Sequence, residues 1–550
     1  MENQRIDGAL FSKLVEGGAA CLRQHEDEVN DLNVFPIPDG DTGSNMLLTV
    51  SGGGKAGARA DAELGKAARA AADGMLLSAR GNSGVILSQF FDGVATGFEN
   101  IKDADADALS AAFLCGVDHA YAAVVQPVEG TVLTVMRSAA QYAAAQPHTT
   151  VEAYFSDFLS AAERALQNTP ELLPVLKKAG VVDSGGAGFI YIIEGMAAVL
   201  RGESVPEYEA QHAQAGAAAH EIDLDRFDEN SELTYGYCTE LLLRLQNAKT
   251  DIAAFDVNVI KDYLQSVGES VVCFQTGSIV KLHVHTKTPY KVLQFCQDYG
   301  EYLTVKIENM SLQHNNLSEA GEESAAPGER KPFAVVAVAA GAGVKETFTE
   351  MGADHIVEGG QSMNPSTDDF IEAFKAVNAD TIFVLPNNGN VILAAKQAAK
   401  LYTDADVRVI ESHTIGDCYA VLSMLDTDGG NADEIEESMK AAMDGVVTAA
   451  VSKCVRDTEM NGFALTSGQY IGFIGKEILA AADARRDAVC MLVDHLDFAD
   501  REICILVRGV DSDPAEAEDI CAYIRKVKPS CEVYAIDGGQ DVYSYILILE

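Results

Sequence analysis

Residues 33–46 read NVFPIPDGDTGSNM, an acidic loop that leads into a predicted helix. Asp39 and Asp41 stand two positions apart, and Pro36 and Pro38 stiffen the chain before them. Two carboxylates on a rigid loop can hold a hard cation such as Mg²⁺ and share it with substrate phosphates. The helix start that follows offers hydroxyls, an amide and backbone N–H groups to an anion, from Thr42, Gly43, Ser44 and Asn45. A capped helix after an acidic turn explains the same residues without a ligand.

A second loop of this kind lies at residues 79–84, ARGNSG, directly before the apolar run VILSQFF. Its small residues would let a phosphate approach a helix N-terminus closely. Two further loops in the same region repeat this composition, and the candidate residues of the three loops are Asn82, Ser83, Gly84, Thr131, Asp183, Ser184 and Gly185. None of the loops matches the P-loop pattern GxxxxGK[ST] or a GxGxxG after a strand. Flexible connections between helices are the alternative interpretation.

The sequence around these loops predicts helices almost throughout the first 203 residues. Ala-rich runs such as residues 62–79 and 106–125 repeat apolar groups at helical spacing. Strand-like runs begin only after a polar stretch, and toward the C-terminus short apolar runs alternate with helices. The predicted organisation is multidomain: an all-α domain (1–203), a linker (204–220), a small α+β domain (221–317), an acidic linker (318–332) and an α/β domain (333–550).

The chain has 550 residues, a hydrophobic fraction of 48% and a formal net charge of −43. A chain with this negative charge repels nucleic acid backbones and anionic lipid surfaces. We therefore expect no nucleic acid partner. The N-terminus lacks the basic and apolar regions of a signal peptide, and no apolar run is long enough for an integral membrane segment. Eleven scattered cysteines without a CxxC pair suit reduced thiols, so we expect a cytoplasmic protein.

In the predicted α+β domain, residues 281–286 read KLHVHT. His283 and His285 fall on one face of a strand, because side chains alternate along a strand. Cys238 lies in another strand-like run, and a thiolate with a pair of imidazoles would form a Zn²⁺ site with one open position. Glu240 is a candidate fourth ligand, or a residue that holds one of the ligands in place. Half-exposed strand histidines beside a buried thiol are the alternative interpretation.

The α/β domain carries two polar loops, at residues 359–367 and 385–390, that we expect at the carboxyl ends of strands. Binding sites of α/β folds lie at these ends, but Ser366 and Asn390 suit helix N-caps equally well. The sheet is predicted to be largely parallel. Four apolar runs near the C-terminus are predicted as further strands, and the first of them is AVCMLVDHL at residues 488–496.

The first domain resembles the nucleotide-binding domain of the dihydroxyacetone kinase family. The resemblance rests on four stretches in order: LNVFPIPDGDTGSNM (32–46), ARGNSGVILSQ (79–89), PVEGTVLTV (127–135) and GVVDSGGAGF (180–189). The domain order is similar to that of one branch, the catalytic subunit of bacterial fatty acid kinase. This resemblance implies an antiparallel helical barrel of the dihydroxyacetone kinase L-type, which holds ATP through a pair of Mg²⁺ ions.

The resemblance assigns Mg²⁺ binding to Asp39, Asp41 and Asn33, the last an amide where the family has an acid. It assigns phosphate contacts and closure around the nucleotide to Thr42, Gly43, Ser44, Asn45, Asn82, Ser83, Gly84, Thr131, Asp183, Ser184 and Gly185. The arginine of dihydroxyacetone kinases before the last loop has no clear counterpart in ELLPVLKK, residues 171–178. The middle domains of similar proteins carry the same HxH text, which supports the zinc hypothesis.

The implied function is ATP-dependent phosphorylation of a fatty acid carboxylate to an acyl-phosphate for phospholipid synthesis. The resemblance implies a separate carrier of the DegV family of fatty-acid-binding proteins, docked by the α/β domain, and it suggests a homodimer. Truncation after Ser318 is expected to keep ATP binding but to lose carrier-dependent turnover. Two alternatives stay open: a kinase for a small polyol or ketone, such as dihydroxyacetone, and a non-catalytic nucleotide-sensing scaffold.

Overall fold

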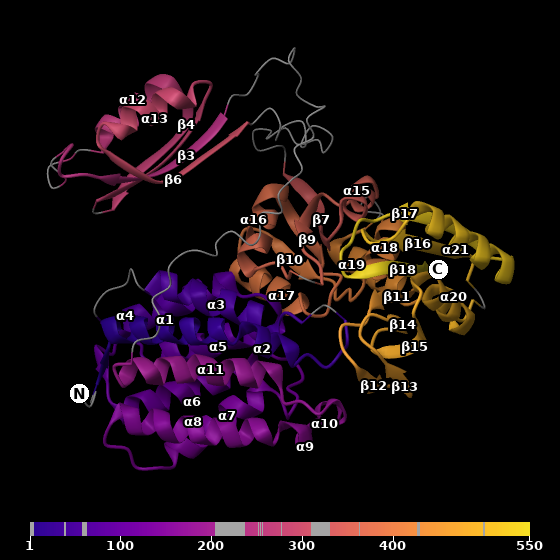
Figure 1. Ribbon diagram of the computed structural model, residues 1–550, viewed down its shortest axis with the longest axis horizontal. Coiled ribbons are helices and arrows are strands. Elements are labelled where there is room, and N and C mark those ends of the chain that lie inside the picture. Colours follow the sequence, from indigo (N-terminus) through magenta and orange to yellow (C-terminus); the bar gives the residue numbers. More distant parts are fainter. Residues whose placement is uncertain are drawn as a thin grey trace. The chain divides into compact units, whose positions relative to one another are not determined.

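We describe the fold from a computed structural model of the chain. The structure describes residues 5–37, 40–57, 63–203, 237–250, 252, 255, 257–276, 278–309, 330–361, 363–425, 430–498 and 501–550. The chain forms two compact units: Met1–Glu209 together with Pro327–Glu550, and Ala210–Ala326. Each unit has its own secondary-structure elements (Figure 1). Each also has its own hydrophobic core.

The first part of the first unit is almost entirely helical, as its Ala-rich runs predict. Carboxylates cap several of the helices: Asp7 accepts from the Leu10 N–H at 2.8 Å, and Asp105 accepts from the Ala108 N–H at 3.1 Å. The elements are β1 (Ile6–Asp7), α1 (Gly8–Gln24), α2 (Glu26–Asp31), α3 (Thr42–Gly57), α4 (Leu64–Ser78), α5 (Gly81–Gly97), β2 (Asp103–Ala104), α6 (Ala106–Ala122), α7 (Val132–Ala144), α8 (Val151–Gln167), α9 (Thr169–Leu172), α10 (Pro174–Ala179) and α11 (Ser184–Leu200).

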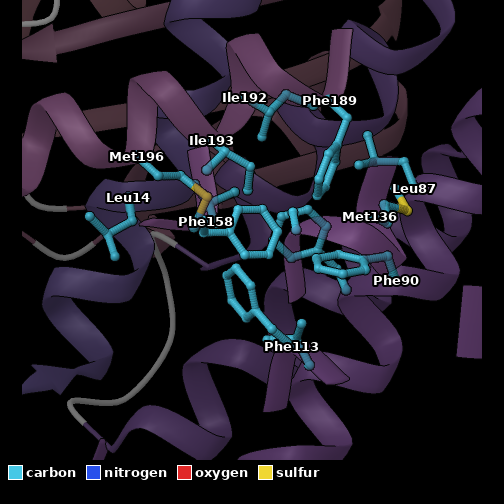
Figure 2. Close-up of a cluster of buried hydrophobic side chains, with 14 of the residues drawn as sticks. Leu14, Leu87, Phe90, Phe113, Met136, Phe158, Phe189, Ile192, Ile193 and Met196 are labelled. Atoms are coloured by element: carbon cyan, nitrogen blue, oxygen red, sulfur yellow. The ribbon is translucent and has the colours of Figure 1, made fainter. Parts of the chain in front are cut away.

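Aromatic rings from α5, α6, α8 and α11 form the centre of this helical domain (Figure 2). Phe113 contacts Phe90 edge-to-face at 5.5 Å and Phe158 at 5.2 Å between ring centroids, and Phe189 contacts Phe90 at 5.2 Å. All four side chains are fully buried. Each such pair contributes about 0.5–1.5 kcal/mol beyond the burial of its area. The cluster therefore fixes the directions of α5 and α11, both of which begin at the candidate site described below.

The second unit is an antiparallel sheet in the order β4-β5-β3-β6, with helices α12 and α13 over one face (Figure 1). Its elements are β3 (Tyr237–Leu245), α12 (Asn258–Val267), β4 (Glu269–Thr276), β5 (Ile279–Thr286), α13 (Pro289–Gln297) and β6 (Gly300–Asn309). Leu241 and Leu243 of β3 and Leu282 of β5 pack with Ile260 of α12 in one buried cluster. Alternate strand positions thus face the helices, as expected for a sheet covered on one side.

The α/β domain begins with a parallel sheet in the order β10-β9-β7-β8. Its elements are β7 (Lys331–Ala339), α15 (Ala342–Glu350), β8 (His355–Glu358), α16 (Thr367–Val377), β9 (Ala379–Leu385), α17 (Ile392–Leu401) and β10 (Asp406–Val409). Consecutive residues of β7 are buried, because side chains on both of its faces are covered. The polar loops after β8 and β9 lie at carboxyl ends of strands, as predicted. Ser366 caps α16, whereas Asn390 caps no helix, since Val391 precedes α17.

A second sheet follows, in the order β15-β14-β11-β18-β16-β17. The remaining elements are α18 (Ile415–Ser423), α19 (Ala432–Met443), β11 (Val447–Lys453), β12 (Thr458–Met460), β13 (Phe463–Leu465), β14 (Tyr470–Ile474), β15 (Glu477–Ala482), α20 (Arg485–His495), β16 (Ile503–Arg508), α21 (Pro514–Val527), β17 (Glu532–Asp537) and β18 (Tyr543–Leu549). Only β16 and β17 pair in parallel. The prediction of a largely parallel sheet is therefore wrong here. A tight turn at Gly475 and Lys476 joins β14 to β15 as an antiparallel hairpin.

The run AVCMLVDHL, predicted as a strand, is the helix α20. Its buried residues Ala488, Val489, Leu492 and Val493 follow a helical spacing, and Met491 between them is exposed. A short apolar run does not distinguish a strand from a buried helix face, which explains the error. The predicted fold class is confirmed: an all-α domain, a small α+β domain and an α/β domain. In the described part of the chain, no helix is long and apolar enough to cross a membrane.

Candidate functional site

A cavity of about 500 Å³ lies in the first unit, lined by both the helical domain and the α/β domain. Five helices begin at it, α3, α5, α7 and α11 of the helical domain and α17 of the α/β domain. The N–H groups of a first helical turn have no partner within the helix and carry partial positive charge. In α5, α7 and α17 the preceding side chain makes no capping hydrogen bond. Together these helix N-termini form a cavity suited to an anion.

The cavity gathers residues of all four loops that the sequence analysis singled out in the helical domain. Its lining includes Asp41, Thr42, Asn45, Asn82, Ser83, Thr131, Asp183, Ser184 and Gly185. The chain separates these loops by tens of residues, and the fold brings them to one place. That they bind a nucleotide stays a prediction. Asp39 lies outside the described residues.

Asp41 lies directly before α3, and its carboxyl group is largely buried. Burial raises the pKa of this carboxyl to about 6, and hydrogen bonds from the side chains of Asn45 and Asn364 offset part of the rise. Asn364 belongs to the α/β domain, 323 residues further along the chain, and its side-chain N–H donates to Asp41 Oδ2. The carboxylate predicted to bind a metal is thus held from both domains.

Asp183 is a second largely buried carboxylate at the cavity. Its Oδ2 accepts from the Gly186 N–H at 2.7 Å, and the backbone N–H of Val132 at the start of α7 also donates to it. Burial outweighs both hydrogen bonds and raises the pKa of Asp183 to about 6. The hydroxyl of Ser184 donates to Thr42 Oγ1 at 3.3 Å, so α3, α7 and α11 begin beside one acid. Within the described structure, no basic side chain contributes to the pKa shift of either carboxyl.

Two buried amide oxygens of this region have no hydrogen-bond partner among the described residues: Oδ1 of Asn82 and Oδ1 of Asn364. The Asn82 side-chain N–H donates at 3.4 Å to Gly389 O and to Asn390 Oδ1 in the α/β domain. A buried polar atom left without a partner costs roughly 1–3 kcal/mol. Carboxylate and amide oxygens are the ligands that Mg²⁺ prefers. Asp41, Asp183 and Asn82 line the cavity, and their carboxylate and amide oxygens fit a magnesium ion.

The start of α5 requires glycine at position 81. Gly81 has φ of 57°, in the left-handed region that favours glycine. A Cβ atom built there would lie 2.6 Å from Asn45 Nδ2. Any side chain at this position would displace Asn45, which donates a hydrogen bond to Asp41.

Four other predicted site residues are not part of the cavity lining: Asn33, Gly43, Ser44 and Gly84. The Ser44 hydroxyl donates to Glu26 Oε1 at 2.6 Å, and the Gly43 N–H donates to Asn30 Oδ1 at 2.7 Å. These contacts tie the start of α3 to α2. The structure thus gives Gly43 and Ser44 a part in positioning Asp41, while direct phosphate contacts from them stay a prediction.

The α/β domain also holds the acidic loop. The guanidinium of Arg456 donates to the main-chain oxygen of Asn33, and the Val455 N–H donates to Pro36 O at 3.0 Å. Ile37 is buried in the core cluster of the α/β domain. The loop therefore lies against a domain whose sequence starts about 300 residues later.

A second set of contacts joins the start of α5 to the α/β domain. The Arg80 guanidinium donates to Asn364 O at 2.6 Å and pairs with Asp369 at 3.4 Å. The Thr367 N–H donates to Ala79 O at 3.2 Å. The sequence predicts no individual site residue in this domain. The available signal was the pair of polar loops at the strand ends, which contain Asn364 and the residues before α17.

The zinc hypothesis concerns side chains that lie outside those the structure describes, namely Cys238, His283 and His285. The backbone register places Cys238 opposite His285 and Glu240 opposite His283 on adjacent strands. Among the side chains that the structure does describe, no group of three or more His, Cys, Asp or Glu could hold a metal.

Known proteins are similar to this chain over its whole length. Protein YloV of Bacillus subtilis (strain 168) is 38% identical over 558 residues, which cover 100% of both chains. An uncharacterized protein of Staphylococcus aureus (strain USA300) is 35% identical over 99% of this chain and 100% of its own. Family models match residues 36–198 (DAK2 domain), 234–317 (FakA-like middle domain of fatty acid kinase) and 334–550 (FakA-like C-terminal domain of fatty acid kinase). The chain belongs to the FakA-like family of fatty acid kinase proteins.

Two solved structures resemble part of this family member. The crystal structure of DegV, a fatty acid binding protein from Bacillus subtilis, covers 40% of this chain and 99% of its own, with 11% identity and a TM-score of 0.30. The Fak B3 protein of Streptococcus pneumoniae loaded with linoleic acid covers the same shares, with 12% identity and a TM-score of 0.28. Similarities this low carry no argument about function.

Proposed function

We propose that this chain is the catalytic subunit of a fatty acid kinase, which binds ATP with Mg²⁺ in the cavity and phosphorylates a fatty acid carboxylate. The observation that carries the proposal is the meeting of five helix N-termini and two buried carboxylates at one cavity of about 500 Å³. Helix N-termini bind phosphates, and carboxylates hold the metal that accompanies them. Apolar side chains also line the cavity and suit a nucleobase, among them Ile86, Val128 and Leu393.

The proposed reaction is a direct phosphoryl transfer. An oxygen of the fatty acid carboxylate forms a bond to the γ-phosphorus of ATP. The bond between that phosphorus and the β,γ-bridging oxygen breaks, and ADP leaves with the electron pair. Because a carboxylate is ionised at neutral pH, no proton has to be removed from it. The chain then contributes positioning and charge stabilisation, which dominate catalysis of phosphoryl transfer. The product is an acyl-phosphate for phospholipid synthesis.

We assign the metal to Asp39 and Asp41, with Asn33 as a further oxygen ligand, and we expect a pair of ions. Bound Mg²⁺ supplies charge neutralisation on the transferring phosphoryl group. We assign the phosphates to the first turns of α3 and α5 and closure around the nucleotide to Thr131 and the start of α11. Carboxylates are negatively charged and suit Mg²⁺, while hydroxyl and N–H groups donate hydrogen bonds and suit the phosphate oxygens.

We propose that the acceptor is presented by a separate fatty-acid-binding carrier of the DegV family, docked by the α/β domain. The family description supports this, because it describes the matching proteins as similar to one subunit of a kinase. A homodimer, a cytoplasmic location and the domain boundaries at 1–203, 221–317 and 333–550 stay predictions.

The function is tested by ATP consumption of the purified full-length chain with Mg²⁺. Oleate alone, an oleate-loaded carrier, the empty carrier and dihydroxyacetone serve as separate acceptor conditions. We expect ADP release only with the loaded carrier, together with an acyl hydroxamate after hydroxylamine is added, because hydroxylamine traps acyl-phosphates. Phosphorylation of dihydroxyacetone would instead identify a small-molecule kinase. ATP binding without turnover in every condition would identify a nucleotide-sensing scaffold.

We also propose that Cys238, His283 and His285 bind a structural or functional Zn²⁺ ion, supported by the backbone register that pairs Cys238 with His285. Metal analysis of the full-length chain should give one zinc ion per chain, and His283→Ala should lose it. The matched control is His495→Ala, because His495 is exposed at the end of α20. A wild-type chain purified without zinc, and unable to retain added zinc, would contradict the proposal.

A further inference from the structure

The charges around the cavity are unbalanced. Of the described residues that line it, Asp41, Asp183 and Glu411 are acidic, and Lys396 is the one that carries a positive charge. A nucleoside triphosphate would bring several more negative charges into this cavity. Metal ions offset part of that charge where the helical domain supplies carboxylates. Where α17 lines the cavity, with Ile392, Leu393 and Lys396, the phosphate charge must be offset by groups of the protein itself.

Lys396 is held in place by its helix. Gln397, the next residue of α17, is buried, and its side-chain N–H donates to Leu76 O at 2.7 Å. Gln89 of α5 in turn donates to Gln397 Oε1 at 3.1 Å. These hydrogen bonds join α17 to α4 and α5, the second of which begins at the cavity. A helix anchored in this way gives the backbone of Lys396 a defined position at the cavity, from which its side chain can reach a bound anion.

The present partner of Lys396 is one that a phosphate can replace. Its ammonium group donates to Glu411 Oε1, which lowers the pKa of Glu411. The side chains of Lys396 and Glu411 are 32% and 57% exposed, so water screens the pair. Screened ion pairs contribute little to stability. Exchange of the single carboxylate charge for a terminal phosphate, which carries more charge and more acceptor oxygens, therefore costs little.

We propose that Lys396 of the α/β domain binds the γ-phosphate of ATP, so that the domain assigned to carrier docking also completes the nucleotide site. This inference rests on the proposed ATP binding and specifies it. The α17 N-terminus beside Lys396, at Asn390 and Ile392, presents further N–H donors to the same anion. Because ADP lacks the γ-phosphate, Lys396 distinguishes the substrate nucleotide from the product nucleotide.

The test is calorimetric binding of Mg·ATP and Mg·ADP to the full-length chain without an acceptor. Lys396→Gln should weaken ATP binding roughly tenfold or more, the size expected for a hydrogen bond between charged groups. It should change ADP binding less than about twofold, and Lys396→Arg should restore most of the ATP affinity because it keeps the charge. Glu411→Gln should act in the opposite direction and strengthen ATP binding, since it removes a competing carboxylate. Lys400→Gln, exposed one turn further along α17, is the matched control and should change neither affinity.

Each alternative outcome is distinct. Equal losses of ATP and ADP affinity in Lys396→Gln, with a lower melting temperature, would show a structural role and overturn the inference. Unchanged ATP affinity in Lys396→Gln, beside normal binding by the wild type, would also overturn it but would leave the proposed function standing. A wild-type chain that binds neither nucleotide would overturn the inference and the proposed function together.

Discussion

Replacing Asp41 with asparagine is expected to lower fatty acid phosphorylation at least roughly a thousandfold, because the metal supplies several kcal/mol of charge stabilisation in phosphoryl transfer. The substitution keeps the shape of the side chain and its place before α3 but removes the charge that would hold Mg²⁺. The loss should appear in carrier-dependent ATP turnover and also in Mg²⁺-dependent nucleotide binding, measured separately. An effect on both measurements separates a metal role from a failure of carrier docking.

The same substitution should not destabilise the fold. Burial raises the pKa of Asp41 to about 6, above the ordinary carboxyl value that applies in the unfolded chain. A folded-state pKa raised in this way means that the ionised form costs folding free energy, and the cost grows as pH rises through the window between the two values. At pH 7 Asp41→Asn removes that cost, so its melting temperature without ligand should equal or exceed the wild-type value.

Asp31→Asn is the matched control for Asp41. Asp31 is exposed at the end of α2, and the change removes the same charge from the same region. It should keep wild-type turnover and nucleotide affinity. Retention of more than roughly a tenth of the activity in Asp41→Asn, against the thousandfold loss expected for a metal ligand, would exclude the metal assignment. A large loss of turnover in Asp31→Asn would show that the general negative charge of this region affects activity, and that the loss in Asp41→Asn does not by itself indicate metal binding.

Replacing Asn364 with alanine is expected to lower kcat/KM by about 10–100-fold, the cost seen when a residue that orients a metal ligand is removed. Asn364 is buried, and its side-chain N–H donates to Asp41, while its own main-chain oxygen is held by Arg80. Alanine keeps the main-chain contact and removes only the contact to the carboxylate. Asn364→Asp should lose more than alanine does, because it places a second carboxylate beside Asp41.

The neighbouring Met363→Ala serves as the control for Asn364, since Met363 is 57% exposed in the same loop. The measurements are steady-state kinetics with the loaded carrier and Mg·ATP binding without it. Weaker Mg·ATP binding in Asn364→Ala without a carrier would establish that the α/β domain acts on the nucleotide site itself. Wild-type nucleotide binding with lost carrier-dependent turnover would limit this loop to docking and contradict the prediction.

The sequence predicted the helical domain well because its signals are local. Ala-rich runs, capping acids and glycine-containing loops each act within a few residues, so the loops that contain Asp41, Asn82, Thr131 and Asp183 could be identified from the chain alone. Errors arose where local signals are ambiguous. The apolar run of α20 was predicted as a strand, because an apolar run that short fits a strand as well as a buried helix face. The mixed pairing of the second sheet depends on long-range strand contacts that no local pattern reports.

The structure changes one functional expectation. From the sequence, truncation after Ser318 is predicted to keep ATP binding and to lose carrier-dependent turnover, because the α/β domain is assigned to carrier docking. Removal of this domain would expose Ile37 and Ala79, which are buried in clusters with α/β residues, and would remove Asn364 from Asp41. We now expect the truncated chain to lose nucleotide affinity as well as turnover.

The sequence by itself determined the class of each domain, the loops that gather at the cavity and the family to which the chain is similar, because residue types and their spacing carry that information locally. Only the tertiary structure decided that the Asn364 side chain donates a hydrogen bond to Asp41, and that Lys396 lines the cavity that Asp41 also lines. Asn364 is 323 residues from Asp41 in the chain, and neither Asn364 nor Lys396 stands in a sequence pattern that indicates its place at the cavity. Their proximity follows from the packing of two cores against each other, which depends on the shapes of whole surfaces.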